Sequence, residues 1–122
     1  MKHRSQGRKF GRVRSQRTAM FRTMLGSFIE HERIMTTEAK AKELSGKIDR
    51  VFVMAKKLSD ENRKLSILRT LASRLPESAV KKLSDESFRK RFEKRPSGFS
   101  RVVKLPPRKS DSAKMAVIEM VD

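Results

Sequence analysis

Arginines and lysines near the N-terminus are the residues of this chain best suited to chemistry with another molecule. Residues 1–14 carry six basic side chains and no acid. Arginine presents a planar fork that binds two phosphate oxygens at once and can also stack on an exposed base. The arginines recur every two to four positions, so an extended segment would meet phosphates on both sides. This pattern predicts a polyanion-binding arm.

Positive charge gathers in two blocks of the sequence. The 122-residue chain has 31 Lys and Arg against 14 Asp and Glu, a net charge of +17. Residues 1–33 and residues 86–110 each hold nine basic and two acidic side chains, whereas residues 34–85 hold twelve and seven. A solvated face interleaves both signs, as the middle does, so the two blocks indicate phosphate-contacting surfaces.

Candidate nucleic-acid contacts come from both blocks. They are Lys2, His3, Arg4, Arg8, Lys9, Arg12, Arg14, Arg17, Arg22, Arg95, Arg101, Lys104, Arg108 and Lys109. Arg101 and Lys104 should face opposite sides of a strand, so Arg108 and Lys109, in a loop, are firmer candidates than Lys104. Phe99 stands without the aromatic partners of the common RNA-recognition sheets, which favours recognition of nucleic-acid shape and backbone.

Residue types that would support catalysis or metal binding do not form a constellation. The chain has no cysteine and two histidines, His3 and His31, with no ligand cluster around either. Asp60 and Glu61 are typical of the first turn of a helix. We expect no catalytic site, cofactor, metal or small-molecule substrate, and no membrane partner, because no apolar run approaches the roughly 18 residues of a membrane helix.

The periodicity of apolar residues then predicts the elements that carry these side chains. A helix should begin with Ser15 as its N-cap, and residues 34–37 should form a short strand. Thr37 should cap a second helix over residues 38–58. Its buried side should comprise Ala41, Leu44, Ile48, Val51, Ala55 and Leu58. Residues 59–61 should cap a third helix with Leu65, Leu68, Leu71, Ala72 and Leu75 inward.

The remaining segment is expected to contain short helices followed by two strands. Pro76 ends the third helix, and residues 77–92 should form one or two helices. Strands are predicted over residues 99–105 and 115–121, joined by a basic loop. The fold class is therefore α+β, a two-layer α/β sandwich with a small mixed sheet. We expect one domain over residues 15–122 and a flexible basic arm over residues 1–14 that makes no core contacts.

Several short motifs together resemble the bacterial large-subunit ribosomal protein L-seventeen family. They are Met1-Lys2-His3-Arg4 with Gly7, Arg17-Thr18-Ala19-Met20-Phe21-Arg22, Ile34-Met35-Thr36-Thr37 with Lys40-Ala41-Lys42-Glu43-Leu44, and Gly98-Phe99-Ser100-Arg101-Val102-Val103-Lys104. The ending, with Arg108, Asp111, Ala113, Met115-Ala116 and Ile118-Glu119-Met120-Val121, is also similar. Gln16, Pro96-Ser97 and Ser110 depart from the family pattern, and residues 76–96 are the least similar stretch.

This resemblance implies a structural, cytoplasmic component of the large (50S) ribosomal subunit. The implied partners are large-subunit (23S) rRNA and neighbouring ribosomal proteins near the nascent-chain exit. Three other classes share part of the composition: a nucleoid-type DNA-compacting protein, a small RNA-processing enzyme and a cationic membrane-active helix. A stable dimer without nucleic acid would favour the DNA-compacting protein. The lack of a recognisable group of catalytic residues counts against the RNA-processing enzyme. The acids within residues 38–58, and the absence of Trp, count against the third.

Overall fold

A three-stranded sheet and five α-helices make up the part of the chain that the structure describes. The computed structural model describes residues 8–121. Its elements are α1 (Arg14–His31), β1 (Arg33–Thr37), α2 (Glu38–Lys56), the 3₁₀ turn η1 (Lys57–Ser59), α3 (Lys64–Arg74), α4 (Glu77–Ser84), α5 (Glu86–Lys90), β2 (Ser100–Leu105) and β3 (Met115–Met120).

Helix α1 begins two residues earlier than its sequence predicts. Val13 occupies the N-cap position, and no side chain caps the helix there, so the predicted cap at Ser15 is wrong. Ser15 instead lies inside the first turn. The helix buries Phe21, Leu25 and Phe28 among other apolar residues and ends at His31, and the C-cap residue Glu32, with a φ of 64°, turns the chain into β1.

Helix α2 is the central helix of the fold, and its predicted start is confirmed. The Thr37 hydroxyl oxygen accepts a hydrogen bond from the Lys40 N–H at 3.4 Å, which satisfies one of the unpaired amides of the first turn. The predicted buried side is also confirmed, with Leu58 buried in η1. Phe52 adds a fully buried ring that contacts Phe92 at a centroid distance of 4.5 Å.

Helix α3 differs from its prediction in its start and in part of its buried side. It begins at Lys64 without a side-chain cap, and Asp60 instead accepts the Asn62 N–H within the preceding turn at 3.1 Å. Leu71 and Leu75 are buried as predicted and form an i, i+4 row with Ile67. The prediction is wrong at Leu65, which is 63% exposed, and at Ala72, which is also exposed.

The predicted helices between Pro76 and Phe92 are confirmed as α4 and α5. Pro76 is the N-cap residue of α4, and Asp85 caps α5 by accepting the Ser87 N–H at 3.1 Å. Leu83, Phe88 and Phe92 are buried. Both helices pack into the same core as α1 and α2.

The sheet has the strand order β1-β3-β2 and is antiparallel throughout. The α+β fold class is thereby confirmed, but the expected mixed sheet is wrong. Strands β1 and β2 run in the same direction, yet β3 lies between them, so no parallel pair forms. In the register, Ile118 faces Ile34 and Val102, and Glu119 faces Arg33 and Arg101.

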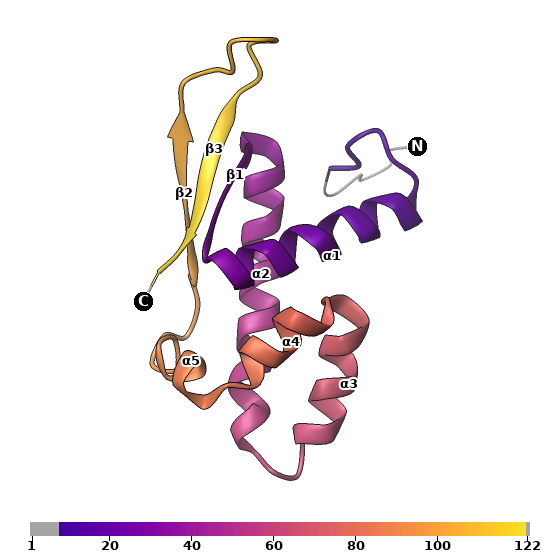
Figure 1. The fold of residues 1–122 in the computed structure, drawn as a ribbon, viewed down its shortest axis with the longest axis vertical. Helices are drawn as coiled ribbons and strands as arrows, with labels where there is room; N and C mark the ends of the chain where they lie inside the picture. The colour runs from indigo at the N-terminus through magenta and orange to yellow at the C-terminus, as the bar shows by residue number, and fades with distance from the viewer. Residues whose placement is uncertain (1–7, 122) are drawn as a thin grey trace, which may run out of the picture.

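The molecule has two layers, with the sheet on one side and the helices on the other (Figure 1). Ala116 and Ile118 of β3 belong to the helix-facing core. Met35 and Val103, beside Val117 on the opposite face, are 67% and 43% exposed. Within residues 8–121, no helix is both long and apolar enough to cross a membrane.

Candidate nucleic-acid interface

The N-terminal candidates divide between the described and undescribed parts of the chain. Lys2, His3 and Arg4 lie outside the described residues. Arg8 forms an ion pair with Glu43 of α2 at 2.8 Å. Phe10 packs edge-on against Phe21, with ring centroids 5.6 Å apart. The expectation that the segment makes no core contact is therefore wrong at Phe10, whose ring lies against the cluster that includes Phe21.

The basic residues at the start of α1 fold back over the chain. Arg12 donates to the Phe10 carbonyl at 2.8 Å, and Arg17 donates to the Arg12 carbonyl at 3.0 Å. Lys9 and Arg14 are exposed. These cations lie near the N-terminus of α1, the positive end of the helix dipole, where an anion would be stabilised. The first turn of α1 contains no acid that could supply that negative charge.

Arg22 has a structural partner that the sequence pattern did not indicate. Its guanidinium donates to the carbonyls of Ala72 and Leu75, at 3.4 and 3.1 Å. These carbonyls lie at the end of α3, where the last groups of a helix lack partners within it. Arg22 therefore links α1 to the end of α3, and its remaining donors face solvent on an exposed side chain.

Cations from both basic blocks meet at the N-terminal end of α2. Glu38 pairs with Lys42 at 2.9 Å and with Lys104 of β2 at 3.7 Å. The hydrogen bond from Lys42 lowers the pKa of Glu38, and the charges of Lys104 and Lys114 add to that effect. Arg8, Lys42 and Lys114 line one surface hollow beside it. The sequence missed Lys42 and Lys114 because neither lies in an acid-poor run.

The candidates on the sheet occupy opposite faces, as strand alternation predicts. Arg101 pairs with Glu119 of β3 at 2.9 Å, whereas Lys104 reaches Glu38 on the helix side. Arg95, in the turn before β2, donates to the Gly98 carbonyl at 3.4 Å. These two strand cations therefore cannot serve one flat surface together.

The loop between β2 and β3 projects beyond the helices (Figure 1). Arg108 donates two hydrogen bonds to Asp111, at 2.9 and 2.7 Å. Together with the Ala113 N–H, this fork lowers the pKa of Asp111 to about 2. Arg108 thus shapes the loop, while Lys109 is exposed beside it. The loop holds both cations away from the core.

No metal or catalytic grouping accompanies these cations in the described residues. Among residues 8–121, no three His, Asp or Glu side chains gather in a way that could hold a metal ion. Asp60 and Glu61 are exposed, and Asp60 pairs with Arg63 at 3.7 Å. The geometry is that of a basic surface with most carboxylates already engaged within the chain.

Comparison with known proteins identifies the family. The family model described as ribosomal protein L17 matches residues 20–121. The chain belongs to the ribosomal protein L17 family. A large ribosomal subunit protein bL17 from Sphingopyxis alaskensis is 42% identical over 122 residues, covering 100% of this chain and 84% of the relative. Proteins of the same name from Sorangium cellulosum and Anaeromyxobacter sp. are 38% and 43% identical, covering all of this chain and 84% and 70% of those proteins.

Membership of the L17 family confirms several expectations drawn from the sequence. The resemblance stated from its motifs is confirmed over residues 20–121. Proteins of this family are structural, non-enzymatic components of the large ribosomal subunit in the cytoplasm.

Proposed function

We propose that this L17-family chain binds large-subunit rRNA through Arg and Lys contacts to the phosphate backbone and supports the rRNA fold during translation. The observation that carries the proposal is the charge surplus on the folded surface. Most carboxylates within residues 8–121 form ion pairs or hydrogen bonds inside the chain, as in the pairs Glu43–Arg8, Glu119–Arg101 and Asp111–Arg108. With 31 basic side chains against 14 acidic ones, many cations remain for a polyanion.

The arrangement of these cations favours recognition of backbone over base sequence. Residues 1–14 would act as an RNA-threading arm, and residues 15–122 as a single domain that docks beside it. Phe99 is fully buried, so it cannot act as a stacking platform. Contacts to phosphates position a protein on RNA without reading its sequence, which suits a structural protein of a large ribonucleoprotein.

The ion pairs within the protein are compatible with such contacts. Arg108 uses Nε and Nη2 for Asp111, which leaves further N–H donors of its guanidinium for a phosphate. Arg101 uses Nε for Glu119. Exposed pairs of this kind contribute little to stability, so RNA can compete for them at small cost.

The place of the chain within the subunit is a further part of the proposal. Resemblance to the L17 family supports a position near the nascent-chain exit, among neighbouring ribosomal proteins. Cross-linking of purified large subunits through the exposed lysines Lys81, Lys90 and Lys109, followed by mass spectrometry, tests it. Cross-links to proteins of the exit region are expected, and cross-links confined to proteins of another region would contradict this location.

Cofractionation tests the function itself. A tagged chain expressed in bacteria should sediment with the 50S peak in a sucrose gradient and remain there after a moderate salt wash. A variant with glutamine at Lys2, Arg4 and Lys9 should wash off at lower salt, because each lost phosphate contact weakens binding electrostatically. A wild-type chain that stays at the top of the gradient at low salt would overturn the proposal.

A further inference from the structure

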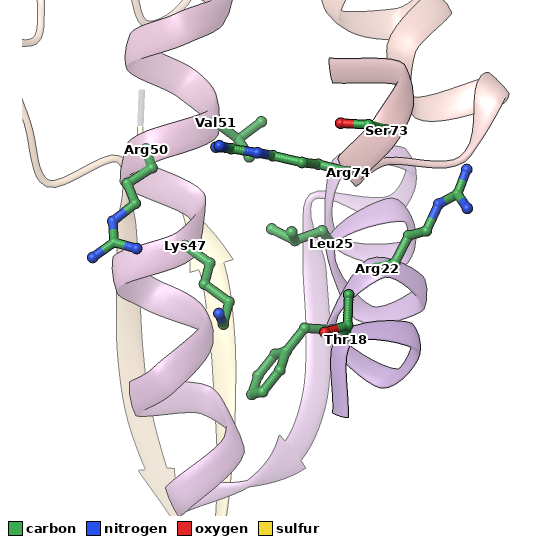
Figure 2. A pocket seen from close by; sticks show the side chains of 9 residues that line it. Thr18, Arg22, Leu25, Lys47, Arg50, Val51, Ser73 and Arg74 are labelled. Atoms are coloured by element: carbon green, nitrogen blue, oxygen red, sulfur yellow. The ribbon is translucent and has the colours of Figure 1, made fainter. Parts of the chain in front are cut away.

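A cationic hollow between α1, α2 and α3 draws three of its four cations from outside the two basic blocks of the sequence. Its volume is about 260 Å³, and its lining includes Lys47, Arg50 and Arg74. Arg74 extends from the end of α3 across the hollow toward Val51, whereas Arg22 and Arg50 lie at its edges and point outward on opposite sides (Figure 2). Three separate helices thus contribute four cations to the hollow and its edges.

Nothing within the hollow balances this charge. Its nine lining residues include no acid. Among residues 8–121, no carboxylate forms an ion pair with Lys47, Arg50 or Arg74. Like charges held close together oppose the folded state unless an anion neutralises them. Elsewhere on the surface, cations such as Lys42 and Lys81 pair with acids one helical turn away. Glu43, one turn before Lys47, pairs with Arg8 instead.

The remaining lining matches the chemistry of a phosphodiester. Thr18 brings a hydroxyl group to the hollow, and hydroxyls share with Arg and Lys the role of phosphate donors in nucleic-acid complexes. Ser73 also lines the hollow, but its hydroxyl donates to the Thr70 carbonyl at 2.6 Å. Phe21, Leu25 and Val51 line its apolar part. The ammonium of Lys47 lies 4.8 Å from the centre of the Phe21 ring, a contact that holds the charge in place.

The size of the hollow limits what it can accept. Pockets that enclose whole small molecules have volumes of about 300–1,000 Å³, so this hollow is below that range. A single stretch of sugar–phosphate backbone needs no enclosure, because the chain enters at one side and leaves at the other. An open cationic hollow at the surface therefore suits a polymer backbone better than a free metabolite.

We propose that this hollow is a separate rRNA-backbone site, in which Arg74, Arg50 and Lys47 neutralise phosphates of the large-subunit rRNA. The inference rests on the proposed function, since it assumes that the chain binds this RNA. It assigns a role to Lys47, Arg50 and Arg74, in a region whose mixed charges resemble an ordinary solvated face in the sequence. Arg22 lines the hollow from α1, while its guanidinium links that helix to the end of α3.

A salt titration of affinity for transcribed 23S rRNA tests the proposal with two charge-matched variants. The double variant R50Q/R74Q removes two cations that line the hollow, and K57Q/K81Q removes two exposed cations of η1 and α4 that lie outside both basic blocks. Each phosphate contact contributes about 0.7–0.9 to the slope of log affinity against log salt. We expect R50Q/R74Q to flatten the slope by about 1–2 units and K57Q/K81Q to leave it unchanged.

The possible results distinguish failure of the hollow as an rRNA site from failure of the proposed function. Equal flattening by both variants, or a wild-type slope in R50Q/R74Q, would overturn the hollow as a site while wild-type binding still supports the proposed function. Loss of salt-dependent binding in the wild type itself would overturn both. Because the side chains of Arg50 and Arg74 are exposed, we expect R50Q/R74Q to keep the wild-type thermal midpoint. Measuring that midpoint shows whether the variant folds.

A second measurement reads proximity instead of charge. The chain has no cysteine, so Ser73→Cys at the rim gives one attachment point for an iron chelate that generates hydroxyl radicals. In reconstituted large subunits, we expect cleavage at discrete rRNA positions, with the cysteine-free wild type treated identically as the control. Absence of cleavage above that control would contradict the site.

Discussion

Gly26 of α1 and Pro76 at the start of α4 pack so closely that only a glycine fits. A Cβ atom added at Gly26 would lie 2.6 Å from Pro76 Cγ and 2.9 Å from its Cδ. A glycine in the interior of a helix costs about 1 kcal/mol relative to alanine. Here the glycine lets α4 cross α1 at close range, and that crossing brings Leu75, Ala79 and Leu83 into the core.

We therefore predict that Gly26→Ala destabilises the protein by up to about 2 kcal/mol, because overpacking against a rigid ring costs about 1–3 kcal/mol and the gain in helix propensity is about 1 kcal/mol. Gly46 in α2 is the matched control, since a Cβ there meets nothing within 4 Å. Gly46→Ala should stabilise by about 0.5–1 kcal/mol. Urea unfolding of both variants checks the pair, and stabilisation by both would contradict the close packing.

The phase of α3 can be tested with two leucines of the same helix. Leu71 is fully buried and Leu65 is 63% exposed. Leu71→Ala should cost about 2–5 kcal/mol through lost burial and a residual cavity, and Leu65→Ala should cost less than about 0.5 kcal/mol. Denaturation midpoints decide between them. Equal losses of stability in the two variants would mean that Leu65 is buried as well, as the sequence pattern predicts.

The contact of Phe10 with Phe21 predicts that the N-terminal segment contributes to stability. Phe10→Ala should lower the free energy of unfolding by about 1–2 kcal/mol, because an edge-on aromatic pair is worth about 0.5–1.5 kcal/mol beyond its buried area. Val13→Ala is the control, since Val13 is 62% exposed and should cost under about 0.5 kcal/mol. Thermal unfolding without RNA checks both variants; an unchanged midpoint for Phe10→Ala would mean that the segment does not dock.

The Arg108–Asp111 pair predicts a pH dependence confined to acid. The pKa of Asp111 is lowered from 3.8 to about 2, first by the Arg108 hydrogen bonds and then by the Ala113 N–H. A lowered pKa in the folded state contributes stability that is present above pH 3.8 and is lost as pH falls through about 2. The pair is exposed, so the contribution is small. Carboxyl NMR titration should show the low pKa of Asp111 rising toward its ordinary value in Arg108→Gln.

Local rules in the sequence predict the elements well wherever one signal dominates. Thr37 is followed by a long amphipathic pattern, and its cap, α2 and the buried side of α2 agree with the structure. In α3, a row through Leu65 and a row through Ile67 both fit helical spacing. Contacts with other helices decide between them, and a single sequence does not contain that information.

The sequence predicts which cations belong to the candidate surface but not which acids they pair with. Block counts identify Arg101 and Arg108 as candidates, yet not their partners Glu119 and Asp111, because those pairs depend on strand register and on the loop turn. The sequence does not predict the hollow either, because the hollow depends on how separate helices pack. Arg50 and Arg74 lie on separate helices, and only the packing of α2 against α3 makes them neighbours.

Salt dependence of rRNA affinity tests the central claim, phosphate binding by the basic N-terminal residues, most directly. Deleting residues 1–14 would also remove Phe10, so the sharper variant replaces the six cations Lys2, Arg4, Arg8, Lys9, Arg12 and Arg14 by glutamine. If about half of them meet phosphates, the slope of log affinity against log salt should flatten by about 2–3 units on 23S rRNA. Preference among RNA sequences should change little. An unchanged slope would show that these residues contribute no phosphate contacts and would contradict the account.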